Sequence, residues 1–187
     1  FQSTDFTDDG IQLIKIGNLY NNRLSLNREP TFLPNSFANK YNQYLLKQDD
    51  IILSMTCTYG KQDYGFAVQI TQKNVQYLMN QRVCKLIAKS GFHQKFLLYM
   101  LRSENYSKHI YKAEGTKQAN LSSSNILMIQ VGIPPLSEQS RIAAVLTAAD
   151  EAIEKEEAYR QKLLALKRGL MEDLLTGKVR TTETINS

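Results

Sequence analysis

The chain has 187 residues, 42% of them hydrophobic, which is enough for one hydrophobic core with an additional element. It has no run of about 18 apolar residues, and its N-terminus lacks the basic start and apolar stretch of a signal peptide, so we expect a cytoplasmic protein without a membrane partner. The formal net charge of +5 comes from residues 1–136, with 15 Lys and Arg against 9 Asp and Glu, while residues 137–187 carry 8 against 9; a basic, polar globular part favours nucleic acid as the partner.

The N-terminal part of the chain alternates short apolar runs with polar turns. Residues 12–16 are predicted to form a strand, and residues 17–23 a polar turn. Ser36 is expected to cap an amphipathic helix that ends at a turn over residues 48–50. One face of this helix would hold four residues at helical spacing: Phe37, Tyr41, Tyr44 and Leu45.

The middle of the chain is predicted to contain three more strands. Short apolar runs indicate them over residues 51–55, 66–70 and 83–88. A polar loop over residues 56–65 joins the first two of these strands. The loop is rich in Gly, Thr, Tyr and Gln, so it is a candidate for contact with a ligand.

Two helices and a last strand are expected before the C-terminal region. The apolar spacing predicts a helix over residues 92–101 and a second, short helix around Tyr106 and Ile110. A loop over residues 114–125 then leads into a predicted strand over residues 129–133. Because strands and helices are interspersed without a regular β-α-β repeat, the sequence predicts an α+β fold with a mixed sheet-and-helix domain.

The C-terminal region is predicted to form one long helix. Pro134 and Pro135 cannot continue a strand, Ser137 is a candidate N-cap, and Gly177 marks the end. The 40 proline-free positions from 137 to 176 give a rod of about 60 Å. We therefore predict three parts: a globular domain over residues 1–136, a spacer and dimerisation helix over residues 137–176, and a tail over residues 177–187.

Apolar residues follow a coiled-coil seam along this helix, with one interruption. The seam consists of Ile142, Leu146, Ala149, Ile153, Tyr159, Leu163, Leu166, Leu170 and Leu174. An acidic segment over residues 151–157 precedes a basic segment over residues 160–168, a polarity that favours an antiparallel copy of the same helix as the partner. The alternative is a solvated helix packed on its own domain. Gly169 lies inside the helix and predicts close approach of another element at that level.

Two sequence blocks at the ends of the helix, with three in the globular part, resemble a known family. The first two blocks read PPLSEQSRIAAVL from residue 134 and LLALKRGLMEDLLTGKVR from residue 163. The others read GIQLIKIGNL from residue 10, DDIILS from residue 49 and GTKQANLS from residue 115. Because it carries these five blocks, the chain resembles the specificity (S) subunit of type I restriction-modification systems. Its globular part resembles the target recognition domain of that subunit.

The chain departs from the family pattern at three points. Asp49 stands where the family usually has glycine, which predicts a slightly different turn. Full subunits of the family hold two recognition domains and two helical regions, whereas this chain holds one of each, so we interpret it as a half subunit. The stretch that often precedes the first strand is absent too, and one edge of the domain is expected to be incomplete.

The resemblance implies a recognition subunit and not an enzyme. Such a subunit reads one half of a bipartite site in double-stranded DNA, docks methyltransferase (M) subunits, and associates with restriction/translocase (R) subunits as a further partner. The residues agree, because the sequence contains no phosphate-binding glycine loop, no methyltransferase motif and no cofactor or metal motif. Cys57 and Cys84 are expected to be reduced thiols. His93 and His109 are interpreted as packing or surface residues.

Two other functions remain open from the residues alone. The first is a coiled-coil adaptor between proteins, without sequence-specific DNA binding. The second is a nuclease with a carboxylate cluster, which is disfavoured because no suitable set of carboxylates and Lys lies in one segment. Asp49 and Asp50 are interpreted as turn residues and not as metal ligands.

Base reading requires Arg, Lys or side chains with paired donors and acceptors, carried on loops that enter the major groove. Three loops carry such residues: Asn18, Tyr20, Asn22 and Arg23; Thr56, Thr58, Tyr59, Lys61 and Gln62; Lys117, Gln118 and Asn120. Lys61 and Lys117 are expected to bind phosphate, and either Gln118 or Arg23 is expected to read a base. For any single residue the alternative is that Asn and Gly only make turns and Lys only adds solubility.

Overall fold

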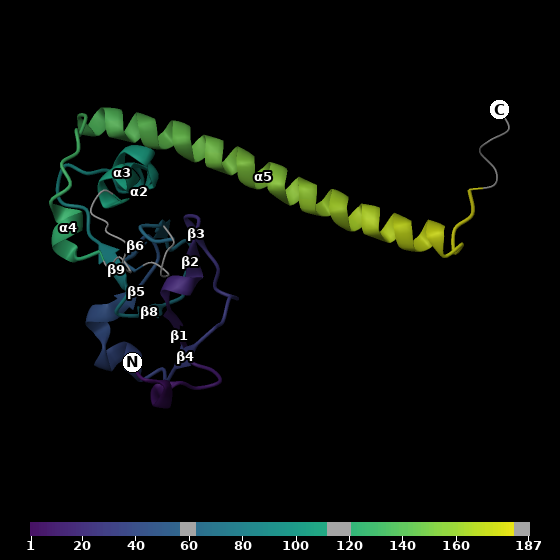
Figure 1. Ribbon diagram of the computed structural model, residues 1–187, viewed down its shortest axis with the longest axis horizontal. Helices are drawn as coiled ribbons and strands as arrows, with labels where there is room; N and C mark the ends of the chain where they lie inside the picture. Colours follow the sequence, from purple (N-terminus) through teal and green to yellow (C-terminus); the bar gives the residue numbers. More distant parts are fainter. Residues whose placement is uncertain (57–62, 112–120, 182–187) are drawn as a thin grey trace. The chain divides into compact units, whose positions relative to one another are not determined.

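The computed structural model describes residues 1–56, 63–111 and 121–181 (Figure 1). The chain divides into two compact units, residues 1–143 and residues 144–187. The first unit combines mixed sheets with short helices, and a long helix begins within it and runs through the second, so the predicted α+β class is confirmed. No helix among the described residues is both long and apolar enough to cross a membrane.

A mixed four-stranded sheet forms one layer of the first unit. Its strand order is β4-β1-β8-β5, with β1 and β8 parallel and the other neighbours antiparallel. Leu13 of β1 lies opposite Leu78 of β8. The four strands are β1 (Ile11–Ile14), β4 (Phe32–Leu33), β5 (Leu45–Leu46) and β8 (Tyr77–Met79).

A second, antiparallel sheet lies in the centre of the first unit. It has the order β7-β6-β9 and consists of β6 (Ile51–Ser54), β7 (Ala67–Gln69) and β9 (Val83–Leu86). Strand β6 is buried on both faces, which explains why its sequence is a continuous apolar run. Ile51 and Leu53 pack among the helices, whereas Ile52 packs toward the four-stranded sheet.

Helices cover the free faces of both sheets. In the described part of the first unit, four helices precede the long helix: α1 (Phe37–Lys40), α2 (Gln94–Arg102), α3 (Glu104–Tyr111) and α4 (Ser123–Leu127). Short 3-10 turns are η1 (Ser3–Asp5), η2 (Ile16–Asn18) and η3 (Asn42–Tyr44). Leu98, Leu101 and Ile110 from α2 and α3 pack against β6 and β7, and α1 packs against the outer face of β1. The resulting order of layers is helices, antiparallel sheet, mixed sheet and short helices.

A two-residue turn forms a small hairpin at the edge of these sheets. Strand β2 (Leu19–Tyr20) pairs antiparallel with β3 (Arg23–Leu24). The turn residues Asn21 and Asn22 have φ values of 48° and 56°. Positive φ at both central positions is the geometry that matches strand twist in tight hairpins, and Asn tolerates it better than most residues. The predicted polar turn over residues 17–23 is therefore an ordered hairpin.

Two predicted elements are wrong, and both reflect packing that local patterns do not encode. The helix expected from Ser36 ends after four residues, because Leu45 and Leu46 are drawn into the sheet opposite β8. Phe37 and Tyr41 still pack on the core, whereas Tyr44 is exposed. The strand expected over residues 129–133 does not form, and Ile129 instead packs from an irregular segment onto the core.

The long helix, α5 (Leu136–Leu175), agrees closely with its predicted range. Ser137 lies inside the helix and not at its N-cap, since the carbonyl of Pro135 already accepts from the amide of Gln139. After the last turn, Gly177 has a φ of 74°, a left-handed conformation that commonly ends helices and favours glycine. The first unit extends through Ala143, so the start of α5 belongs to the packed domain and the predicted boundary at residue 136 marks only where the helix begins.

Candidate nucleic-acid interface

The tip of the β2–β3 hairpin is held from behind by Arg102, in the last turn of α2. Its Nη2 donates to the carbonyl of Asn22 at 3.0 Å, and its Nε donates to the carbonyl of Ala67 at 3.0 Å. The side-chain Oδ1 of Asn22 accepts from the amide of Ala67 at 2.9 Å. These three bonds fix the hairpin against strand β7. Asn22 therefore supports the hairpin, and its Oδ1 is already engaged.

Asn18, predicted to contact DNA, is buried and forms hydrogen bonds within its own loop. It is 1% exposed. Its Oδ1 accepts from the amide of Lys15 at 2.8 Å, and its Nδ2 donates to the carbonyls of Ser25 and Arg28 at 3.0 and 2.8 Å. A carboxamide with these three bonds has no donor left for a base edge. The structure thus gives Asn18 a role in shaping its loop, which differs from the predicted DNA contact.

An exposed aromatic and basic pair lies on the outer side of the hairpin. Tyr20 is 50% exposed, and its ring packs edge-on against Phe66 at 5.5 Å between centroids. The guanidinium carbon of Arg28 lies 6.0 Å from the centroid of the Tyr20 ring, which is within cation–π range. Arg23, on β3, is exposed beside them. Sequence reasoning missed Arg28, although a basic residue in a polar loop just beyond the hairpin was a usable signal.

A cavity of about 380 Å³ opens beside this pair. It is lined by Ile16, Gly17, Leu19, Tyr20, Arg28, Thr56 and Asp63. Thr56, another predicted contact residue, is only 5% exposed and contributes to the wall of the cavity. We call Tyr20, Arg23, Arg28 and this cavity the hairpin face.

Seven predicted contact residues fall outside the part of the chain that the structure describes. They are Thr58, Tyr59, Lys61, Gln62, Lys117, Gln118 and Asn120. The first four belong to the segment that joins Thr56 to Asp63, two residues of the cavity wall. The expectations for all seven stay predictions.

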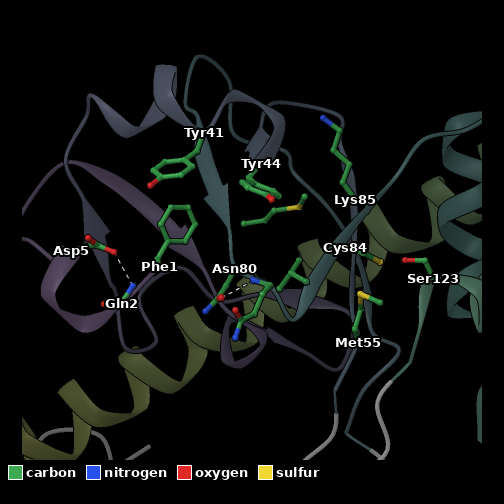
Figure 2. A pocket seen from close by; sticks show the side chains of 13 residues that line it. Phe1, Gln2, Asp5, Tyr41, Tyr44, Met55, Asn80, Cys84, Lys85 and Ser123 are labelled. Atoms are coloured by element: carbon green, nitrogen blue, oxygen red, sulfur yellow. Dashed lines mark hydrogen bonds between the residues drawn. The ribbon is translucent and has the colours of Figure 1, made fainter.

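A larger cavity, of about 780 Å³, lies elsewhere in the first unit and contains Cys84 (Figure 2). Aromatic residues Phe1, Tyr41 and Tyr44 line it on one side, with Cys84 and Lys85 on another. Burial raises the pKa of the Cys84 thiol to about 11, so the thiol is neutral near pH 7 and a poor nucleophile. Cys84 forms no disulfide, in agreement with its predicted state, whereas Cys57 lies outside the described residues.

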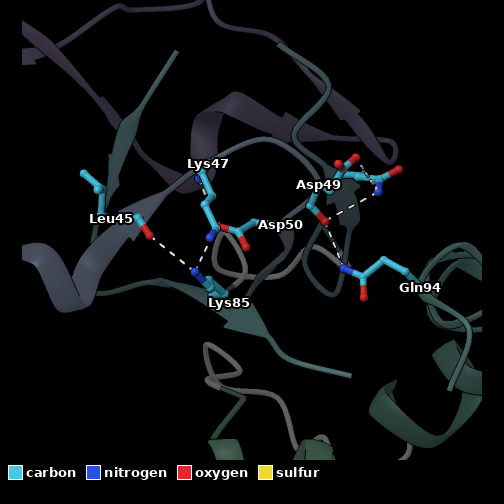
Figure 3. A network of polar contacts seen from close by, with 7 residues as sticks. Leu45, Lys47, Asp49, Asp50, Lys85 and Gln94 are labelled. Carbon is cyan, nitrogen blue, oxygen red and sulfur yellow. Dashed lines mark hydrogen bonds and ion pairs between the residues drawn. The ribbon is translucent and has the colours of Figure 1, made fainter. Parts of the chain in front are cut away.

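A polar network ties the turn before β6 to strand β9 and helix α2 (Figure 3). The carboxylate of Asp50 forms an ion pair with Lys85 at 2.9 Å, and Lys85 also donates to the carbonyl of Leu45 at 3.4 Å. Gln94 donates to the carbonyl of Asp49 at 2.9 Å. Asp49 has a φ of 71°, a conformation that glycine adopts without strain. Both aspartates therefore serve the turn, and no metal-binding group of residues occurs in the described ranges.

The second unit presents an apolar helix surface. The larger seam residues from Leu146 to Leu174 are between 38% and 59% exposed. Three further apolar residues, seven and four positions apart, form a second row beside the seam: Leu164, Met171 and Leu175. An apolar groove of about 320 Å³ runs between the two rows. Among the described residues, no atom outside the backbone of the helix itself lies within 4 Å of a Cβ placed on Gly169.

Comparison with known proteins decides the family. A model described as "Type I restriction modification DNA specificity domain" matches residues 2–165. The chain belongs to this type I DNA specificity family. The predicted resemblance to the specificity family is confirmed.

Named relatives of the specificity family are longer than this chain. The chain is 32% identical over 184 residues to the type I restriction enzyme MjaVIII specificity subunit of Methanocaldococcus jannaschii, which covers 96% of this chain and 42% of the relative. It is 24% identical over 155 residues to the type I restriction enzyme EcoAI specificity subunit of Escherichia coli, with coverage of 82% and 26%. The chain thus spans less than half the length of these two relatives.

Two solved structures share the fold of this chain. The HsdS subunit from Thermoanaerobacter tengcongensis matches with a TM-score of 0.56 and 16% identity, over 93% of this chain and 44% of that one. A chain from work on complex assembly and conformational transition of the type I R-M system matches with a TM-score of 0.57 and 17% identity, over 92% and 40%. At these identities the likeness supports the fold alone.

Proposed function

We propose that this specificity domain reads one half of a bipartite site in double-stranded DNA through its hairpin face. The observation that carries the proposal is the exposed Tyr20–Arg28 pair beside an open cavity, on a hairpin that Arg102 holds rigidly. A rigid support matters because base contacts lose specificity when their geometry is loose. The net positive charge of residues 1–136 supplies the attraction for the phosphate backbone.

Within the hairpin face, we assign different roles to the two arginines. Arg28 is held over the Tyr20 ring, so its guanidinium is oriented at little further entropic cost and suits a phosphate or a guanine edge. Arg23 stands on a strand next to a tight turn and projects from the surface, as expected for a side chain that enters a groove. The predicted loop residues from 58 to 62 and from 117 to 120 complete the proposed contact set.

We further propose that two copies of the chain pair through the seam of α5 in antiparallel orientation. The exposed seam requires a partner, and antiparallel pairing places the acidic segment of one helix against the basic segment of the other. Within the single helix, Glu157 forms an ion pair with its neighbour Arg160 at 3.2 Å, on an exposed surface where such pairs contribute little. An isologous pair of identical domains would meet identical half-sites in opposite orientation, so the target would be an interrupted palindrome.

The second apolar row supports a further partner. Once the seam is buried in a homodimer, Leu164, Met171 and Leu175 would still face outward and suit one more amphipathic helix. We propose that a methyltransferase subunit docks there, with restriction subunits joining the assembly through it. Modification and cleavage would then belong to those partners.

Selection from a random duplex pool tests this proposal. The purified chain, alone and with its methyltransferase subunit, is used to enrich bound DNA at moderate salt. We expect two inverted copies of one short motif, separated by a gap of fixed length. Uniform recovery of all sequences, both with and without the methyltransferase subunit, would refute sequence-specific DNA binding. It would favour the alternative function of a coiled-coil adaptor between proteins.

A further inference from the structure

Gln139, in the first turn of α5, is buried and fully hydrogen-bonded to main-chain groups. It is 1% exposed, whereas its neighbours Glu138 and Ser140 are exposed. Its Oε1 accepts from the amide of His93 at 2.8 Å. Its Nε2 donates to the carbonyls of Gly91 and Pro134, at 2.8 and 2.9 Å.

These three bonds form a clamp between the starts of two helices. Residues 91–93 lead into α2, and His93 is the N-cap of that helix, with its Nδ1 accepting from the amide of Phe96. Pro134 belongs to the segment that leads into α5. One turn further along α5, Ala143 is 2% exposed, so the helix is buried at this position as well. The clamp lies entirely within the first unit.

The chemistry of the clamp selects glutamine. One acceptor and two donors are needed on a single planar group, and a buried carboxamide is tolerated only when its polar atoms are paired. Glutamate would present oxygens to two carbonyls, and an aliphatic residue would leave one amide and two carbonyls without their partner. Only a carboxamide can make these three bonds, and they join α5 to the segment before α2. This arrangement indicates a positioning role for the side chain.

We propose that Gln139 sets the direction in which α5 begins on the recognition domain, and thereby the gap between the two half-sites that a paired molecule accepts. This inference rests on the proposed pairing of two chains through α5. Because the helix is long, the gap is sensitive to its starting direction: over about 60 Å, a tilt of about 3° displaces the far end by about 3 Å. That displacement is close to the rise of one base pair, about 3.4 Å. A clamp that holds direction to a few degrees therefore selects gap length to one base pair.

The test compares Gln139→Met with Gln161→Met, in the full chain with its methyltransferase subunit. Gln161 lies on the same helix, is exposed, and donates to the carboxylate of Glu157 at 2.7 Å on the helix surface, so it is a matched control. The probe is a duplex pool with two inverted copies of the selected half-site, separated by gaps of varied length. We expect the native chain and Gln161→Met to prefer one gap by about tenfold over gaps one base pair longer or shorter, and Gln139→Met to reduce this preference to about twofold.

Base preference within each half-site separates positioning from general damage. The clamp predicts that Gln139→Met keeps the native half-site motif while the gap distribution broadens. An unchanged gap preference would overturn the proposal, and so would a loss of half-site preference in parallel with gap preference. If Gln139→Met does not fold, Gln139→Glu, which keeps the length and one acceptor, is measured under the same criteria.

A second readout does not depend on DNA. The amide of His93 donates to Gln139, so its hydrogen exchange should accelerate by about tenfold or more in Gln139→Met and stay native in Gln161→Met. Slow exchange in Gln139→Met would contradict the clamp. If instead the native chain shows no gap preference and no half-site motif, the proposed function fails, whatever the exchange data show for Gln139.

Discussion

The two hydrogen bonds donated by Arg102 provide a sharp test of how the hairpin face is supported. Arg102 donates to two backbone carbonyls, one at the hairpin tip and one on strand β7, each at 3.0 Å. Replacing it with Met keeps most of the aliphatic length and removes both bonds. The carbonyls of Asn22 and Ala67 then lose their charged donor in a partly buried region.

The size of the effect follows from these two bonds. Hydrogen bonds from a charged donor contribute about 1.5 to 3 kcal/mol each when buried, and partial exposure places this pair at the lower end. The bond from the amide of Ala67 to Asn22 survives the substitution, so the hairpin stays attached at one point. We therefore expect Arg102→Met to lower the free energy of unfolding of the first unit by about 2 to 3 kcal/mol.

Urea unfolding followed by tyrosine fluorescence measures this loss. The chain has 10 Tyr and no Trp, and most of the tyrosines lie in the first unit, so the signal reports mainly on that unit and not on the long helix. Arg82→Met is the control, because Arg82 is exposed and should change stability by less than about 0.5 kcal/mol. Equal stability of Arg102→Met and Arg82→Met would refute the claim that the hydrogen bonds of Arg102 stabilise the hairpin.

Three further predictions address reading, titration and pairing. Arg28→Met should flatten the slope of log affinity against log salt by about one unit, whereas Arg23→Met should cost about 1 to 3 kcal/mol of binding free energy at one base position. Anisotropy titrations measure both. An unchanged slope would contradict phosphate binding by Arg28, and an equal loss at all base positions would contradict base reading by Arg23. The folded-state pKa of Cys84 is raised from 9.0 to about 11, so its stabilising contribution is complete below pH 9 and is lost as the pH rises to 11. Native protein should therefore lose about 2 kcal/mol more than Cys84→Ser across that interval, and parallel losses in urea unfolding would contradict the burial of the thiol. Leu170→Asp should shift sedimentation toward the monomer, while Ala158→Asp, about 120° around the helix from Leu170 and outside the seam, should not; dissociation by both, or by neither, would place the interface elsewhere.

The elements that sequence reasoning located well carry a strong local signal. Helix α5 has a long apolar period without proline and a glycine at its end, and β6 is a continuous apolar run buried on both faces. Asp49 shows why a family pattern with glycine exists at that turn. Its φ of 71° requires the left-handed conformation, which Asp adopts at some cost and Gly without strain.

The elements that sequence reasoning missed depend on distant partners. Strand β8 has only three residues and becomes a strand because β1 and β5 pair with it on both sides. Likewise, Asn18 looked like a reading residue because polar loop residues usually are exposed, yet it closes its own loop from inside. Gln139 could not be distinguished from a solvated helix residue, because its three partners lie up to 48 positions away along the chain.

The central claim, that this domain distinguishes DNA sequences, is tested most directly by a competition titration at physiological salt. The selected duplex and a scrambled duplex of equal composition compete for the purified chain with its methyltransferase subunit. Our account predicts a preference of about a thousandfold or more for the selected duplex, as is usual for specific DNA-binding proteins. A ratio near one would contradict it.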